Sequence, residues 1–430
     1  MLALLWSEAP TRMDIVTLIE MIGVRGVRRL ALTLAPEEPL TVVTGPTGSG
    51  KTTLVECLGL LGAAGRSSEE FYLLANELLA RRDLQRREND KILLQAVIFD
   101  GKLKLPTLRY AVVFGLDEGK AVVVGESLGT VEPDKDDPNR FDLIRMPDVG
   151  GFRSPGADIM AGQPAWRRQR KAKNNTQFSV RRDQLVLHTD AHPGANPVLR
   201  RAAAALSKLN MMSFHPAPEG EQPPEEHASS QHQDDAWRWR GLQDGDPERW
   251  QRALGLARIV LGPSLGNLRA FTPPGGGDPV LEAHFADVPA PVRAERLPKV
   301  QREWLMALGW VFTYQRPGAL LGIAQPELCF PEEAIGALAW ELRRAKTRTL
   351  FATESDAVLR LLRNPTESLY VGRQLEPDRI VFAQPQAKPL RAALLRHGDL
   401  AWVRNNGALD ETLGEPLDDV GWPPLPDPKG

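Results

Sequence analysis

The chain has 430 residues, of which 42% are hydrophobic and 25% are charged, and its formal net charge is −2. This length exceeds what a single hydrophobic core usually supports and predicts two or three domains or lobes. The balanced charge excludes a globally basic nucleic-acid-binding protein, so any contact with DNA has to come from a local basic patch.

The compartment is predicted from cysteine usage and from the apolar runs. The two cysteines, Cys57 and Cys329, lie far apart and give no disulfide framework, which fits a reducing environment. The apolar stretch at residues 1–6 is too short for the core of a signal peptide. No run approaches the roughly 18–20 apolar residues that span a bilayer. We therefore expect a cytoplasmic protein with no membrane segment.

The first 130 residues are expected to form strands around one glycine-rich loop. Apolar or alternating runs predict strands at residues 15–22, 30–34, 40–44, 92–99, 108–114 and 121–126. Residues 116–119 (Leu-Asp-Glu-Gly) predict a hairpin turn between the last two strands. Leucine spacing predicts a helix over residues 69–89.

The middle of the chain contains two polar stretches. Residues 132–173 are rich in turn formers and end in the basic cluster 167–173. Residues 215–235 are rich in Pro, Glu, Gln and Ser, and we expect this segment to be mobile. Helices are predicted over residues 197–210 and 247–261.

The C-terminal third returns to an α/β pattern. The predicted elements are helices at 298–313, 331–345 and 355–363 and strands at 318–323, 348–353, 367–371 and 379–384. Residues 423–430 form a proline-rich tail.

A phosphate-binding loop is the most informative motif. It consists of Gly45, Pro46, Thr47, Gly48, Ser49, Gly50, Lys51, Thr52 and Thr53. A predicted strand precedes it and a helical segment follows, which is the context that a P-loop requires. Glycine backbone amides and the helix N-terminus favour phosphate oxygens, Lys51 would reach the β- and γ-phosphates, and the Thr52 hydroxyl would ligate Mg²⁺. The motif predicts binding of a nucleoside triphosphate.

A second segment carries a resemblance to a known family. Residues 318–331 read as a strand followed by Ala324-Gln325-Pro326-Glu327-Leu328. With the P-loop 273 residues upstream (324 − 51), the chain resembles the SMC/RecF-like branch of ABC-type ATPases. This branch includes predicted ATPases of overcoming-lysogenization and phage-defence type. Those proteins typically carry Asp-Glu-Pro-Glu-Leu or Glu-Gln-Pro-Glu-Leu at this strand end.

The resemblance extends over residues 13–372, with departures from the family pattern. Residues 22–27 match the family's entry motif, but valines replace its aromatic residues. Residues 297–303 occupy the position of the signature loop and lack its Ser-Gly-Gly core. Residues 349–355 match the switch-histidine strand, with Glu354 where the family has histidine.

These departures bear on hydrolysis. Ala324 has no group to hold a magnesium-bound water, and Gln325 stands at the general-base position, where an amide does not accept a proton usefully. Glu327 is left as an alternative base, although its side chain is expected to point past the phosphate. Glu354 would repel a γ-phosphate rather than sense it.

The resemblance implies an α/β P-loop NTPase head of ABC/RecF type with a mixed α/β insertion lobe. The head would comprise residues 13–130 and 297–385, the lobe residues 131–296, and a C-terminal extension residues 386–430. ATP and Mg²⁺ are the implied cofactors. ATP would be held between two heads, in a homodimer or with another ATPase head, and hydrolysis would be weak. DNA maintenance or anti-phage defence with an effector nuclease is the implied biology.

Several alternatives stay open at this stage. The chain could instead be a non-catalytic scaffold subunit of a larger complex; a P-loop kinase fits poorly, because such chains are usually shorter. The basic cluster 167–173 is either a DNA contact or a solvated loop. Trp237 and Trp239 either stack on bases or, as we favour, pack inside a lobe. The histidines have no partners at metal-ligand spacing, so no metal other than Mg²⁺ is expected.

Overall fold

The computed structural model describes most of the chain outside a few loops and the two ends. The described residues are 14–24, 27–34, 38–80, 91–100, 107–117, 119–130, 142–145, 166–168, 185–188, 196–214, 225–274, 276–376 and 379–415. The proline-rich tail at 423–430 lies outside them.

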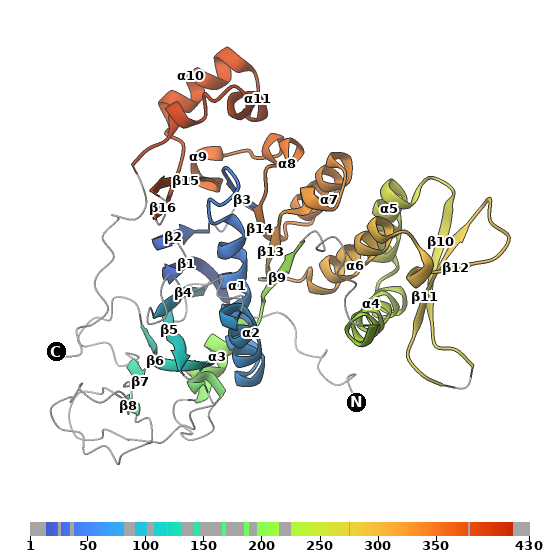
Figure 1. Ribbon diagram of the computed structural model, residues 1–430, viewed down its shortest axis with the longest axis horizontal. Helices are drawn as coiled ribbons and strands as arrows, with labels where there is room; N and C mark the ends of the chain where they lie inside the picture. Colours follow the sequence, from blue (N-terminus) through green and yellow to red (C-terminus); the bar gives the residue numbers. More distant parts are fainter. Residues whose placement is uncertain are drawn as a thin grey trace.

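One large mixed sheet organises the molecule (Figure 1). Its order is β8-β7-β6-β5-β4-β1-β2-β16-β15-β3-β14-β13-β9. The strands are β1 (Asp14–Val24), β2 (Val27–Thr33), β3 (Leu40–Thr44), β4 (Ile92–Asp100), β5 (Leu108–Asp117), β6 (Lys120–Thr130), β7 (Asp142–Arg145), β8 (Trp166–Arg168), β9 (Leu209–Ser213), β13 (Leu320–Ala324), β14 (Arg348–Ala352), β15 (Leu369–Glu376) and β16 (Arg379–Ala383). The five strands β9, β13, β14, β3 and β15 pair in parallel, whereas those from β8 to β2 pair antiparallel. The α/β architecture predicted from the sequence is confirmed.

Helices cover both faces of the parallel half of the sheet. They are α1 (Lys51–Arg66), α2 (Ser68–Ala80), α3 (Asn196–Leu206), α4 (Glu225–Gly245), α5 (Pro247–Leu261), α6 (Lys299–Tyr314), α7 (Glu332–Arg344), α8 (Asp356–Arg360), α9 (Pro365–Ser368), α10 (Ala387–His397) and α11 (Leu400–Asn405). Side chains of a strand alternate between faces. In β13, Leu320 accordingly belongs to the core under α1 and Leu321 to the core under α7. The fully apolar β13 is thus explained by burial on both sides.

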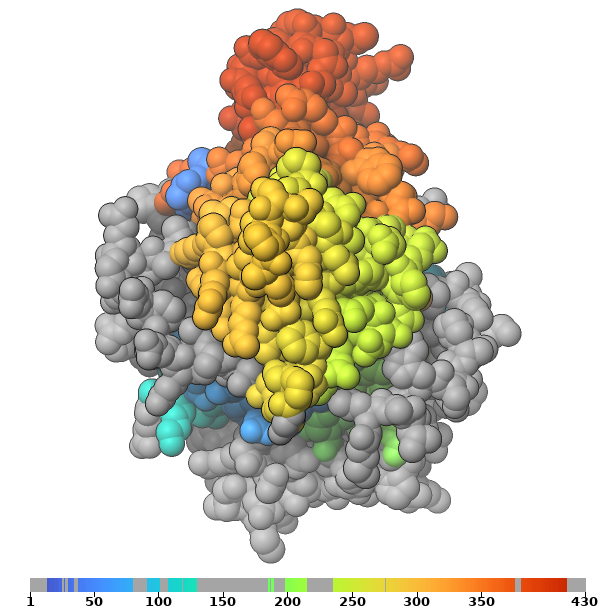
Figure 2. All heavy atoms as spheres, turned by 90° about the vertical axis from the view of Figure 1, so that its right-hand side faces the viewer, coloured from blue at the N-terminus to red at the C-terminus, as the bar shows by residue number. Residues whose placement is uncertain are grey.

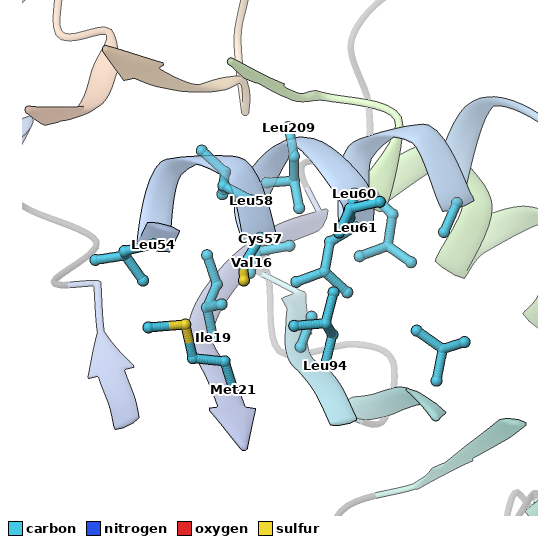
Figure 3. Packing of buried hydrophobic residues seen from close by; sticks show 14 of the residues in the cluster. Val16, Ile19, Met21, Leu54, Cys57, Leu58, Leu60, Leu61, Leu94 and Leu209 are labelled. Atoms are coloured by element: carbon cyan, nitrogen blue, oxygen red, sulfur yellow. The ribbon is translucent and has the colours of Figure 1, made fainter. Parts of the chain in front are cut away.

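Helix α1 is the centre of the first core (Figure 3). It is buried on all sides and packs on β1, β4 and β9. This packing depends on glycine at one position above all: a Cβ built on Gly62 would lie 2.0 Å from the carbonyl oxygen of Leu209 in β9. Only a residue without a side chain allows this strand to approach the helix so closely.

A separate helical layer lies beside the parallel strands. It consists of α4, α5 and α6, joined to a small antiparallel sheet of β10 (Leu265–Phe271), β11 (Val280–Phe285) and β12 (Val292–Arg293) (Figure 1). Residues of this layer, coloured yellow-green to yellow, face the viewer in Figure 2. Asp246 caps α5, since its side chain accepts the amide hydrogen of Arg249 at 3.0 Å and Pro247 stands at the first helical position. Helix α5 begins and ends where the sequence predicts.

One predicted segment of this region is wrong, and a second is described only in part. The helix predicted over 197–210 ends at Leu206, and Leu209–Ser213 forms β9, because its backbone pairs in parallel with β13. Of the segment predicted to be mobile over 215–235, residues 225–235 belong to helix α4, which begins at Glu225. Residues 215–224 lie outside the described residues. The Glu, Gln and Ala residues of α4 favour a helix in spite of their polarity.

The domain division stays a prediction. Strand β9, from within the predicted lobe 131–296, nevertheless pairs with β13 of the predicted head. Helices α10 and α11, from the predicted extension 386–430, add Leu390 and Leu400 to the second hydrophobic core.

Candidate nucleotide site

The glycine-rich loop joins β3 to α1, as a P-loop does. Gly45, Gly48 and Gly50 have φ values of 142°, 85° and 78°, which side-chain-bearing residues adopt at a cost. The loop is tightly packed, since a Cβ on Gly45 would lie 2.4 Å from the carbonyl oxygen of Gly372 in β15. The glycines therefore permit this loop conformation, and the close contact of Gly45 with β15 restricts it.

Three oxygen atoms surround the ammonium group of Lys51. Nζ donates to the carbonyl oxygens of Gly45 and Pro46 at 2.5 and 2.9 Å and forms an ion pair with Oε1 of Glu354 at 2.9 Å. Lys51 is buried, whereas Glu354 is half exposed. A buried cation requires such compensation, and Glu354 supplies the negative charge.

The next residue, Thr52, contacts the end of β13. Its hydroxyl donates to Oε1 of Gln325 at 2.9 Å. Gln325 has the left-handed backbone conformation (φ 53°, ψ 47°). Its backbone N–H donates to the carbonyl oxygen of Ala352 at 2.8 Å. The structure thus brings the predicted magnesium ligand and the residue at the predicted general-base position into direct contact. The methyl group of Ala324 is completely buried in the sheet.

Glu327 is engaged with the end of the neighbouring strand β14. Its Oε2 accepts the hydroxyl hydrogen of Thr353 at 2.6 Å, and its Oε1 accepts the amide hydrogen of Glu354 at 2.9 Å. Both carboxylate oxygens are therefore occupied in holding the segment that carries Glu354. In this geometry Glu327 holds the segment that carries Glu354, and its role as a general base stays a prediction.

A cavity of about 400 Å³ opens beside the loop, lined by Gly45, Pro46 and Glu354 together with residues of β15 and of the C-terminal segment. Two arginines of its wall were missed by the motif analysis. Arg404 of α11 donates to the backbone carbonyl of Glu354 and to Asp356 Oδ1, the latter at 2.6 Å. Arg373 of β15 pairs with Asp410 at 2.9 Å. Neither belongs to a sequence motif, so only the fold reveals their position.

These residues fit a phosphate ligand with a magnesium ion. Besides the lysine, two hydroxyl groups, that of Thr44 at the end of β3 and that of Ser49 in the loop, are buried without a hydrogen-bond partner in the described structure. Thr52 and Gln325 offer the oxygen atoms that Mg²⁺ prefers. Helix α1 directs its N-terminus at the loop, which favours an anion there.

Other predicted features have mixed outcomes. Trp239 is fully buried and donates to the Leu305 carbonyl oxygen at 3.0 Å, so it packs as predicted, whereas Trp237 is half exposed. In the basic cluster 167–173, residues 167 and 168 end β8 and the others lie outside the described residues.

Neither a metal-ligand cluster nor a membrane-spanning helix is found among the described residues. No cluster of three or more His, Cys, Asp or Glu side chains there has the arrangement of a metal site. Within those same ranges, no helix is both long and apolar enough to cross a membrane.

The comparisons by sequence give one match, and it covers the P-loop. A family model described as an AAA domain matches residues 19–72, which include the P-loop. A search among curated proteins finds no match.

Solved structures similar to this chain include three SMC heads. One is an SMC head bound to the C-terminal winged-helix domain of ScpA (9% identity; 88% of this chain and 99% of that chain covered; TM-score 0.43). A second, from Pyrococcus furiosus, has an extended coiled coil and is bound to the C-terminal domain of ScpA (11% identity; 89% of this chain and 98% of that chain covered; TM-score 0.43). A third is the SMC head from Thermotoga maritima (9% identity; 86% of this chain and 99% of that chain covered; TM-score 0.34). At these TM-scores the likeness is distant, so the assignment of the fold stands on the P-loop, the sheet and the family match.

The P-loop between a strand and a helix of a parallel α/β sheet, together with the family match over the same residues, defines the class of P-loop NTPase folds. The P-loop, the ends of β13 and β14 and the start of α1 converge on one site.

Proposed function

We propose that the chain is an ATP-binding head whose ATP-driven dimerisation acts as a slow switch, with weak hydrolysis. The observation that carries this proposal is the ion pair between Lys51 and Glu354 at 2.9 Å. It places a carboxylate on the cation that would bind the phosphates of ATP. ATP binding would then require displacement of Glu354, which slows entry and ties the nucleotide state to the position of β14.

Weak hydrolysis follows from the groups at the strand ends. Gln325 stands beside Thr52 where a carboxylate would be expected to activate water, and a neutral amide is a poor base. Glu327 has both oxygens bound elsewhere. The lack of one general base typically lowers the rate ~10²–10⁴-fold. Mg²⁺, when bound, would neutralise phosphate charge, and Thr52 with Gln325 would hold it.

The biological role that we propose is DNA maintenance or anti-phage defence in the cytoplasm, with an effector nuclease as partner. It is supported by the resemblance of the motifs to ATPases of that type and is a hypothesis at the level of the fold. DNA contact through residues 167–173 belongs to the same hypothesis.

A second candidate function is a non-catalytic scaffold subunit in a heteromeric complex. The segment 297–303, which lacks a Ser-Gly-Gly core, favours this candidate, because the start of α6 presents Lys299 and Val300 instead of small residues. In that complex an active head would supply the missing loop.

Three measurements on the purified chain test the proposal. Calorimetry with ATP and Mg²⁺ measures binding, phosphate release measures turnover, and light scattering measures mass with and without ATP. We expect micromolar to millimolar binding that Lys51→Ala abolishes, little turnover, and a dimer only with ATP. Rapid turnover of the unmodified chain contradicts the slow switch. Absence of ATP binding, or a monomer in ATP that dimerises only with another head, favours the scaffold.

A further inference from the structure

A second positively charged site lies at the N-terminal ends of strands β3 and β14, whereas the P-loop lies at the C-terminal end of β3. We call it the basic hollow. It is a cavity of about 610 Å³ lined by Trp340, Arg343, Arg344, Lys346, Arg348 and Arg363. Strands β3 and β14 pair in parallel, and the hollow borders the start of both, whereas the nucleotide site borders their ends. Five residues of strand, roughly 17 Å, separate the two sites.

Part of this charge has a structural explanation. Arg343 donates to the carbonyl oxygen of Leu361 at 2.8 Å, and Arg344 forms a double hydrogen bond with Glu341 at 2.9 and 3.0 Å. Both stand in the last turn of α7, where cations stabilise the helix dipole. These two arginines therefore need no ligand.

The remaining cations lack compensation. Arg348 is only 8% exposed; its Nη2 donates to backbone carbonyl oxygens of Val16 and Leu34, while its buried Nη1 has no partner in the described structure. Burial lowers the pKa of Arg348 to about 10, and no carboxylate acts against this shift. A buried donor without a partner costs free energy. Because Arg348 lines the hollow, an anion there would lie close to this uncompensated guanidinium charge.

Two exposed cations border the same hollow. Lys346 follows α7 in the left-handed conformation (φ 54°) and Arg363 follows α8. The described part of the chain shows neither in an ion pair. Glu38 is the one carboxylate described in the lining, and it accepts the amide hydrogen of Leu40 at 3.5 Å. The described charge of the hollow is thus strongly positive.

An aromatic surface completes the site. Trp340 is 54% exposed, which is unusual for so large an apolar side chain, and Arg344 lies over its ring at 5.9 Å. An exposed indole beside unpaired cations offers a stacking surface and phosphate-binding groups together, and base–aromatic stacking combined with cationic groups is how proteins bind nucleotides without sequence preference.

We propose that the basic hollow binds a nucleotide, either free or as one unit of a single strand, with its phosphate at Arg348, Lys346 and Arg363 and its base on Trp340. A volume of about 610 Å³ suits a ligand of this size. This site is independent of the P-loop and of the ATPase function proposed above.

Fluorescence anisotropy with a labelled oligothymidylate, in the full chain carrying Lys51→Ala, tests the proposal without interference from the P-loop. Lys346→Gly removes the charge and suits the left-handed backbone, so this variant is expected to fold. We expect Lys346→Gly combined with Arg363→Ala to weaken binding at least 10-fold, with each lost phosphate contact lowering the salt dependence. Trp340→Ala is expected to weaken it several-fold.

Matched controls come from the C-terminal helices. Trp402 is 58% exposed and Lys388 is exposed on α10, so Trp402→Ala and Lys388→Ala should change the affinity less than 2-fold. Competition with thymidine monophosphate distinguishes the sources: displacement by the monomer indicates a free nucleotide, and displacement only by oligomers indicates a single strand. Absence of binding, equal loss in the controls, or competition by inorganic phosphate as strong as by the monomer with no effect of Trp340→Ala would each overturn the proposal.

Discussion

Lys51 of the P-loop and Glu354 at the end of β14 are joined by an ion pair of 2.9 Å, although 303 residues separate them in the chain. The carboxylate neutralises the lysine that a phosphate would otherwise neutralise. Arg404 and Glu327 fix the backbone on both sides of this pair, through the carbonyl oxygen and the amide of Glu354. The state of the P-loop is therefore linked to the C-terminal helix α11.

Glu354→Gln is predicted to tighten ATP binding. The amide keeps the shape of the side chain but removes the negative charge that competes with phosphate for Lys51. Because Glu354 is half exposed and its charge is screened by solvent, we expect the affinity for ATP to rise roughly 3- to 10-fold. This difference in affinity becomes smaller at high salt. Calorimetry at two salt concentrations measures it.

Glu333→Gln is the control for this change, since Glu333 is exposed on α7 and lies outside the nucleotide site. It should leave ATP affinity unchanged. Weaker binding in Glu354→Gln would show that the carboxylate helps to hold the nucleotide rather than competing with it.

Gln325→Glu is predicted to raise Mg²⁺-dependent phosphate release by at least 10-fold. A carboxylate at this position keeps the acceptor for the Thr52 hydroxyl and adds the charge and basicity that the amide lacks. Ala324→Glu is expected to gain less, because Ala324 is completely buried and a charge there is costly. A phosphate-release assay compares the two with Gln386→Glu, an exposed glutamine before α10. A larger gain from Ala324→Glu would mean that residue 324 rather than 325 faces the reacting phosphate.

Much of the parallel sheet could be predicted from sequence, because β13 is apolar throughout and β3 and β14 are apolar at three of five positions, as expected for strands buried along their whole length. Strand β9 was missed, since Leu209-Asn210-Met211-Met212-Ser213 has no β-branched residue and only its pairing with β13 makes it a strand. Helix α4 was missed because its first half is polar apart from Ala228, so its sequence shows no apolar face.

Some residues of the nucleotide site could be predicted from the sequence, and others are brought there only by tertiary packing. The P-loop is local, and its residues could be predicted from spacing alone. Glu354 was recognised by its place in the family pattern, but the contact with Lys51 depends on the packing of β14 beside β3. Arg404 and Arg373 reach the site through tertiary contacts that no local pattern encodes.

Gly62→Ala is predicted to destabilise the fold. Its Cβ would lie 2.0 Å from the carbonyl oxygen of Leu209, and the rigid backbone of β9 has to move to admit it. Overpacking of this kind typically costs about 1–3 kcal/mol. Gly255→Ala in α5 is a matched control, because its Cβ meets open space, and it should stabilise by about 0.5–1 kcal/mol. Urea unfolding of the two variants measures both effects. A neutral Gly62→Ala would contradict the close approach of β9 to α1.

Cys329 is predicted to react slowly with thiol reagents at pH 8. Burial, with the charge and hydrogen bond of Glu303, raises the pKa of this thiol from 9.0 to about 11. The folded protein therefore keeps the proton between pH 9 and pH 11, and the reactive thiolate is on the order of 0.1% of the thiol at pH 8. In a Cys57→Ala background, where Cys329 is the one thiol of the chain, the rate should rise about 10-fold per pH unit up to pH 11. Glu303→Gln should raise the rate at pH 8 several-fold, because it removes the negative charge, and Glu333→Gln should not. A rate that levels off near pH 9 in the folded protein would show that the thiol has an ordinary pKa and that Glu303 does not act on it.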